Sequence, residues 1–186
     1  QTTVWEAPPA VGAGKLSRAE QISLGWGYIN MGHSYLDIGK AEAAIRFWTS
    51  VFPDGEIGRI TPFGKGEEPD QEGALKHGTF SLLGEEFAAI ESAHQHRFAF
   101  NEAISFMVNC DTQAEIDYYW EKLSAVPEAE QCGWLKDRYG VSWQVVPRGM
   151  EAMLGGGDRE RIDRVTQAFL QMKKIDTARL REAYEG

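Results

Sequence analysis

The sequence has little cysteine. Only Cys110 and Cys132 occur in 186 residues, and they form no CxxC pair. Disulfide scaffolds and cysteine-rich zinc sites need several cysteines at defined spacings, and this chain does not provide them. Two isolated cysteines are typical of small core residues in a reducing compartment, so we expect a cytoplasmic protein.

The sequence also lacks a basic surplus and a long apolar run. It has 19 Lys and Arg against 28 Asp and Glu, which gives a net charge of −9. Binding to nucleic acid or to an anionic membrane needs Lys and Arg clustered on one face. No apolar run approaches the roughly 20 residues that span a bilayer. We therefore expect neither nucleic acid nor a membrane as a partner.

A composition of 42% hydrophobic and 25% charged residues is that of a globular domain, and within it one pattern occurs twice. The first copy predicts a strand at 33–38, a helix at 39–52, and strands at 57–63, 75–83 and 86–92. The second copy predicts a strand at 103–109, a helix after the capping box Thr112-x-x-Glu115, and strands at 131–137 and 141–146. The second copy is shorter by one strand, or has one that is poorly marked.

This repeat predicts an α+β fold, in which paired βαβββ modules form a cupped mixed sheet and a helical tail follows. The expected parts are an N-terminal extension at 1–31, a domain at 32–149 with modules at 32–97 and 98–149, and a C-terminal helical tail at 150–186. Residues 1–31 would form either an arm that packs on a partner subunit or an extra edge strand.

Alternation along the strands divides each predicted sheet into two faces. One face is apolar and suits helix packing, whereas the other is small or polar. The open-face residues are His33, Tyr35, His77, Thr79, Ser81, Ser105, Met107 and Gln144. Two open faces that meet would enclose a pocket; otherwise they would be solvated sheet surfaces.

Several stretches resemble a known family. They are Gly39-Lys40-Ala41-Glu42-Ala43-Ala44, Phe52-Pro53-Asp54, the segments 100–106 and 110–112, the run 133–147 from Gly133-Trp134-Leu135 to Val145-Val146-Pro147, and 172–176. Together they resemble the PhnB-like branch of the vicinal oxygen chelate superfamily, which includes glyoxalases, bleomycin-resistance proteins and dioxygenases. The resemblance covers residues 33–184 and is most specific over 100–147.

The resemblance implies a homodimer of paired modules with a small molecule bound in the cup, often on a divalent metal. The ligand positions of glyoxalase-type members fall on His33, Glu91, Ala103 and Gln144. Ala103 cannot coordinate a metal, and Gln144 offers a neutral amide oxygen. The candidate metal ligands are therefore His33, Glu91 and Gln144, with a metal-free site as the alternative.

We predict that His33, Glu91 and Gln144 converge on the open face. The expected ligand-binding residues are His33, Tyr35, Glu91, Ser105, Met107 and Gln144. Two functions stay open at this stage. One is an enzyme of the lyase, isomerase or dioxygenase type acting on a small oxygenated substrate, with its catalytic residues unassigned. The other is a non-catalytic protein that binds or sequesters a small molecule.

Members of this branch are often labelled 3-demethylubiquinone-9 3-methyltransferase-like. A common S-adenosylmethionine-dependent methyltransferase needs a glycine-rich turn after the first strand of a parallel sheet. Gly155-Gly156-Gly157 precedes a helical segment but follows no strand, so we interpret it as a hinge. The sequence therefore argues against that chemistry.

Overall fold

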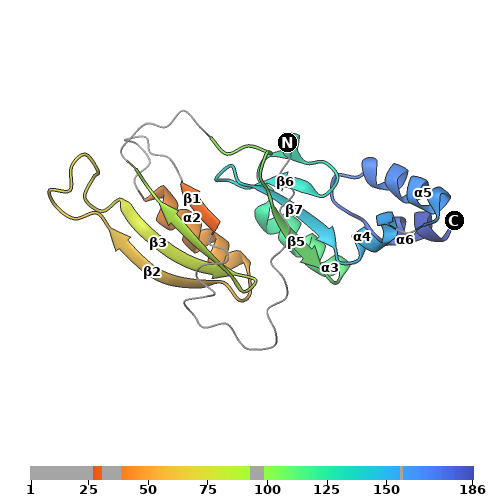
Figure 1. The fold of residues 1–186 in the computed structure, drawn as a ribbon, viewed down its shortest axis with the longest axis horizontal. Helices are drawn as coiled ribbons and strands as arrows, with labels where there is room; N and C mark the ends of the chain where they lie inside the picture. Colours follow the sequence, from red (N-terminus) through yellow and green to blue (C-terminus); the bar gives the residue numbers. More distant parts are fainter. Residues whose placement is uncertain (1–26, 31–38, 93–98, 156) are drawn as a thin grey trace.

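The computed structural model describes residues 27–30, 39–92, 99–155 and 157–186, with the backbone alone for 27–30 (Figure 1). The first module contains β1 (Gly27–Asn30), α2 (Lys40–Val51), β2 (Glu56–Pro62), β3 (Leu75–Leu82) and β4 (Glu85–Ile90). The second contains β5 (Phe106–Cys110), α3 (Gln113–Leu123), the 3-10 turn η1 (Pro127–Ala129), β6 (Trp134–Lys136) and β7 (Ser142–Pro147). The tail contains α4 (Met150–Gly155), α5 (Arg159–Leu170) and α6 (Thr177–Glu185).

Two sheets repeat one topology. The four-stranded sheet has the order β1-β4-β3-β2, and the three-stranded sheet has the order β5-β7-β6. In each module the first strand pairs in parallel with the last, and the other pairs are antiparallel. The predicted α+β fold with a shorter second copy is confirmed.

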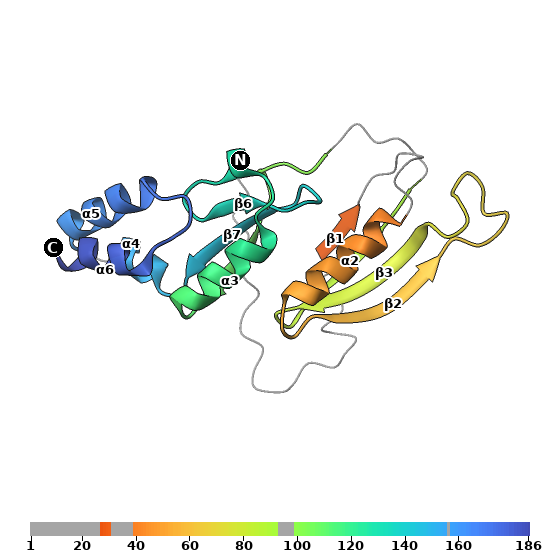
Figure 2. The same cartoon turned by 180° about the vertical axis from the view of Figure 1, so that it is seen from behind.

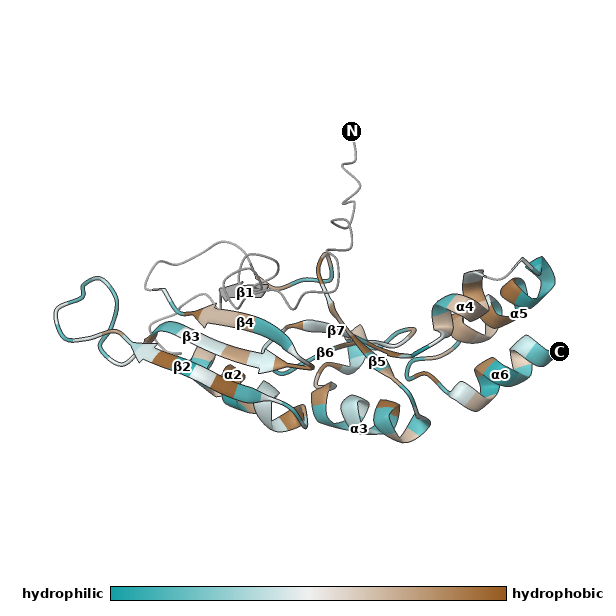
Figure 3. Cartoon of the chain, turned by 60° about the horizontal axis from the view of Figure 1, so that its bottom comes forward, coloured by the Kyte–Doolittle hydropathy of each residue, from teal (hydrophilic) through white to brown (hydrophobic). Residues whose placement is uncertain are grey.

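The helices α2 and α3 cover the same side of the two sheets (Figures 2 and 3). The side of α2 that packs on its sheet carries Ala41, Ala44, Ile45, Trp48 and Val51, all buried, as the apolar spacing predicts. The helix α3 begins at the predicted capping box, because the Thr112 and Glu115 side chains satisfy each other's backbone N–H groups.

Two tight turns set the register of the hairpins. Leu83 and Gly84 both have positive φ, 51° and 80°, and they join the paired residues Leu82 and Glu85. Cys132 and Gly133, at 53° and 82°, make the same kind of turn before β6. Two consecutive positive φ values match the right-handed strand twist, so such turns favour close hairpins.

One predicted strand needs correction, and another is not tested. The strand expected at 33–38 lies outside the described residues. Within the extension at 1–31, Gly27–Asn30 pairs with β4 at the edge of the sheet, which matches one of the two expectations for that segment. The strand expected at 103–109 begins instead at Phe106, and Ile104 is 76% exposed. The Asn101 side chain accepts a hydrogen bond from Ala103 N at 3.0 Å, and this local turn outweighs the apolar pattern before Phe106.

A buried carboxylate joins the two modules. Asp137, between β6 and β7, is 1% exposed. Its Oδ2 accepts hydrogen bonds from the Trp48 indole of α2 at 2.7 Å and from the Trp143 indole of β7 at 2.9 Å. Its Oδ1 accepts the N–H groups of Tyr139 and Val141 at 2.8 and 3.0 Å. Four donors replace the water that the buried charge has lost.

Ring contacts surround this carboxylate and extend the contact between the modules. Phe52, after α2, lies 5.1 Å from Tyr119 of α3 and 5.5 Å from Trp143, measured between ring centroids. Phe87 of β4 meets Phe106 of β5 at 5.4 Å. These tilted and edge-on pairs are favourable aromatic geometries, so the two modules share one core.

The tail is part of this fold. Cys132 N donates to Met172 O at 2.8 Å, and Gly133 N donates to Lys173 O at 2.7 Å. Ile175 and Leu180 are buried in the common core. The Asp158 and Asp176 side chains cap α5 and α6. Within the described residues, no helix has the length and apolarity that a membrane span requires.

We predict that Asp137→Asn lowers the free energy of unfolding by about 2–3 kcal/mol, because the new amide places a donor against indole and backbone donors. Urea unfolding followed by tryptophan fluorescence measures the change. Asp163→Asn, at an exposed position on α5, is the matched control. A loss no larger than that of the control would contradict a role of Asp137 in joining the modules.

Candidate ligand site

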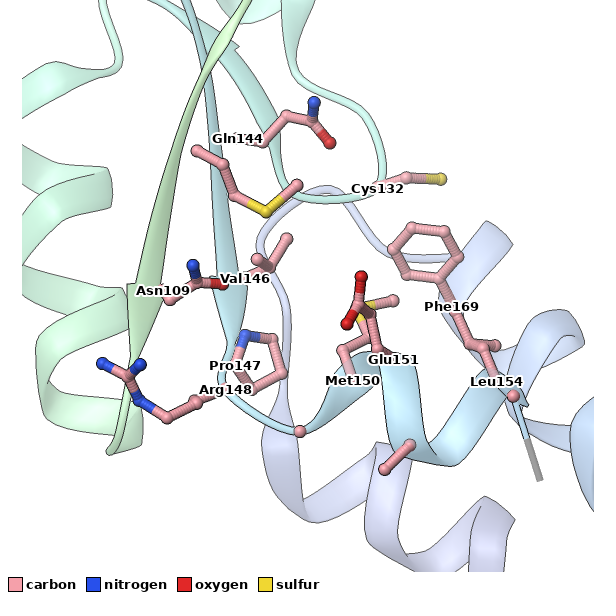
Figure 4. Close-up of a pocket in the computed structure, with 14 residues that line it drawn as sticks. Asn109, Cys132, Gln144, Val146, Pro147, Arg148, Met150, Glu151, Leu154 and Phe169 are labelled. Atoms are coloured by element: carbon pink, nitrogen blue, oxygen red, sulfur yellow. The ribbon is translucent and has the colours of Figure 1, made fainter. Parts of the chain in front are cut away.

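The second sheet carries a groove of about 810 Å³ on the side away from α3 (Figure 4). The strands β5 and β7 form its floor, and α4 with Phe169 of α5 forms a wall. The lining residues are Met107, Asn109, Cys132, Gln144, Val146, Pro147, Arg148, Gly149, Met150, Glu151, Ala152, Leu154, Gly155 and Phe169. All of them belong to the second module and the tail.

The floor follows from strand alternation. Met107 pairs with Gln144, and Asn109 pairs with Val146, across parallel β5 and β7. Their chain neighbours Val108 and Val145 are buried in the core. Residues two apart on one strand share a face of the sheet, and so do paired residues on adjacent strands. Met107, Asn109, Gln144 and Val146 therefore all point into the groove. The predicted open-face positions of Met107 and Gln144 are confirmed.

Gln144 also contacts a third predicted residue. Its Nε2 donates to Ser105 Oγ, just before β5, at 2.8 Å. Ser105 therefore lies beside Gln144, but it is not among the residues that line the groove. Ser142, two residues before Gln144 on β7, is buried, and its hydroxyl has no hydrogen-bond partner among the described residues.

Glu91 lies on the opposite face from the one predicted. Phe87, Ala89 and Glu91 alternate toward α2, and Glu91 is 2% exposed. Its carboxylate accepts from Ala41 N at 2.9 Å, Leu75 N at 2.7 Å and Gly39 N at 3.3 Å. Gly39 has no side chain to cap α2. The carboxylate of Glu91, directly after β4, caps the helix N-terminus instead.

His33 and Tyr35 lie outside the described residues. The position predicted for His33, on the open face beside Gln144, therefore stays a prediction. Glu91 itself does not line the groove.

The residues that the structure describes do not fit the metal site that the resemblance implies. Glu91 is committed to three backbone N–H groups, and Gln144 offers a neutral amide that is already bonded to Ser105. Over the described ranges, no group of three or more His, Cys, Asp or Glu side chains is placed to hold an ion. We therefore derive no chemistry through a metal.

The sequence does not predict the wall of the groove, because all the expected ligand-binding residues precede the tail. After β7, Arg148 N donates to Cys110 O at 2.7 Å, and Gly149 at φ 95° turns the chain into α4. This turn brings Met150, Glu151 and Leu154 against the floor (Figure 4). The available signal was the proline and glycine at 147 and 149, which mark a sharp turn directly after the last strand.

The two cysteines differ in their surroundings. Cys110 is buried on the helix side of β5, and burial, followed by the nearby charges of Glu115 and Asp111, raises the pKa of its thiol to about 12. Cys132 is partly exposed and lines the groove. The reactive form of a thiol is the thiolate, so burial and the raised pKa both protect Cys110.

We predict that iodoacetamide at pH 8 alkylates Cys132 in the folded protein and leaves Cys110 unmodified. Mass spectrometry of peptides measures each site. Adding urea to unfold the chain should make Cys110 react as well. Modification of Cys110 at the rate of Cys132 in the native protein would contradict its burial.

Comparisons with known proteins agree on the family. The model of the 3-demethylubiquinone-9 3-methyltransferase family matches residues 32–146. The PhnB protein from Bacillus cereus, whose description gives the same family name, is 36% identical with a TM-score of 0.55, and the match covers 66% of this chain and 98% of that one. No curated protein matches.

A second solved structure supports the fold. Protein PA1353 from Pseudomonas aeruginosa is 19% identical with a TM-score of 0.50, and the match covers 66% of this chain and 95% of that one. The family match itself extends over more than half of the chain. The chain therefore belongs to the PhnB-like 3-demethylubiquinone-9 3-methyltransferase family.

Proposed function

We propose that this protein is of the vicinal oxygen chelate type and binds a small oxygenated molecule in the groove between β5, β7 and α4. The observation that carries the proposal is an apolar floor and wall with two amides set into them. Gln144 and Asn109 supply the amides, and Met107, Val146 and Phe169 supply apolar surface.

The groove has the size and chemistry of a small-molecule site. Its volume of about 810 Å³ falls in the usual range of roughly 300–1,000 Å³. Each side-chain amide can donate to a carbonyl oxygen or accept from a hydroxyl, which suits oxygen functions on a compact ligand. Met side chains adapt to ligands of irregular shape, so Met107 and Met150 can close around an apolar body.

The groove suits either catalysis or sequestration of this ligand. For catalysis, Glu151 is a carboxylate that lines the groove and could move a proton on the bound molecule. For sequestration, apolar surface with two neutral amides is sufficient. Turnover of a bound compound, followed by product analysis, separates the two functions.

The family's name refers to a methyl transfer, but we do not propose that reaction for this chain. Common S-adenosylmethionine-dependent enzymes place the cofactor at the ends of adjacent parallel strands. Each described sheet here has a single parallel pair, and its other pairs are antiparallel hairpins.

We predict that Met107→Trp blocks the groove. Met107 is 54% exposed on the floor, so an indole there occupies ligand space without replacing a core residue. Screening with neutral aromatic alcohols and ketones, including tyrosol, should give ligands that raise the melting temperature of the wild type. For these ligands, Met107→Trp should weaken binding at least about tenfold.

The matched control is Ile57→Trp, at an exposed position on β2 outside the groove. It should bind these ligands like the wild type. Unchanged binding by Met107→Trp would place the ligand elsewhere and refute the proposed site.

We also propose that the protein is a homodimer, as the resemblance implies. Ile104 and Phe100 are large apolar side chains exposed on the single chain, and such side chains gain from burial at an interface. Light scattering at micromolar concentration should give twice the mass of the chain. The mass of one chain would refute this assembly.

A further inference from the structure

The groove wall lies beyond the segment that the family model matches. The family match ends at Val146, and nine of the fourteen lining residues come at or after Pro147. The floor thus belongs to the matched segment, whereas α4 and Phe169 are contributed by the tail. Selectivity for a ligand would then depend on residues beyond the segment that the family model matches.

The wall is held in place by backbone bonds and packing. Met153 N donates to Gly149 O at 3.2 Å within α4, and Met150 is buried beside the floor. The tail is fixed to the turn before β6 by the bonds from Cys132 and Gly133 described above. The backbone of α4 therefore has a defined position relative to the floor.

Glu151 is an exposed residue of α4 that lines the groove. Figure 4 shows its carboxylate rising from α4 into the groove. Across the described residues, no hydrogen bond or ion pair engages this carboxylate. The neighbouring cation Arg148 is already engaged, because its Nε donates to Asp111 Oδ1 at 2.6 Å, and Figure 4 shows it directed away from Glu151. The groove therefore presents a negative charge.

We propose that the ligand is a small organic cation: an apolar or aromatic body with oxygen functions and a protonated amine that pairs with Glu151. This inference rests on the proposed binding function and adds the charge of the ligand. The ammonium gains the attraction of the carboxylate, and the Phe169 ring in the same wall can add a cation–π contact. The net charge of −9 favours approach of a cation to the whole chain.

Three probes of nearly equal shape test the charge: tyramine is a cation, tyrosol is neutral, and 4-hydroxyphenylacetate is an anion. Calorimetric titration of the full chain at low ionic strength measures each dissociation constant. We expect tyramine to bind about fivefold more tightly than tyrosol, which is the magnitude of one solvent-accessible ion pair. The anion should bind most weakly, and added salt should reduce the preference for tyramine.

The variant Glu151→Gln assigns the effect to one residue. It should bring tyramine to the affinity of tyrosol and leave tyrosol binding unchanged. The matched control Glu182→Gln, at an exposed position on α6 outside the groove, should keep the full preference. A preference that survives in Glu151→Gln would overturn the role of Glu151.

The outcomes separate this inference from the proposed function. One outcome is that the wild type binds tyramine and tyrosol with equal affinity and that Met107→Trp weakens the binding of both. That result would refute the proposal that the ligand is a cation, but it would support binding in the groove. Failure of all three probes to bind would count against groove binding and the cation together.

Discussion

The buried carboxylate of Asp137 is the constraint on which the rest of this structure depends. A charge that is 1% exposed is tolerated only with a full set of donors, and here two indoles and two backbone N–H groups supply them. One indole comes from α2 of the first module, and the other comes from β7 of the second. The same interaction thus fixes the turn before β7 and orients the first module against the second.

The strand β7 forms the groove floor together with β5, so the position of Asp137 also affects the candidate site. Trp143 points into the core toward Asp137, so its neighbour Gln144 must point the other way, into the groove. The parallel pairing with β5 then places Met107 beside Gln144. A structural carboxylate on one face of the sheet therefore decides which side chains face the groove on the other.

Glu91 is a second buried carboxylate that accepts hydrogen bonds from several donors, here at the N-terminus of a helix. Gly39 leaves the N-terminus of α2 without a side-chain cap, and Glu91, directly after β4, accepts from the N–H groups of Gly39 and Ala41. The two most buried acidic side chains of the described residues thus have structural roles. The carboxylate available to a ligand is contributed instead by Glu151, on a tail helix beyond the family match.

The sequence by itself determined the modules, the caps and the alternation of β5 and β7. These depend on short-range periodicity and local hydrogen bonds, so Thr112 with Glu115, Asp158 and the open-face positions of Met107 and Gln144 could be predicted. Only the tertiary structure decided the face of Glu91, because a helix end distant in sequence competes for it. Likewise, contacts between residues 132–133 and 172–173 place the tail, and no local pattern encodes that α4 becomes a groove wall.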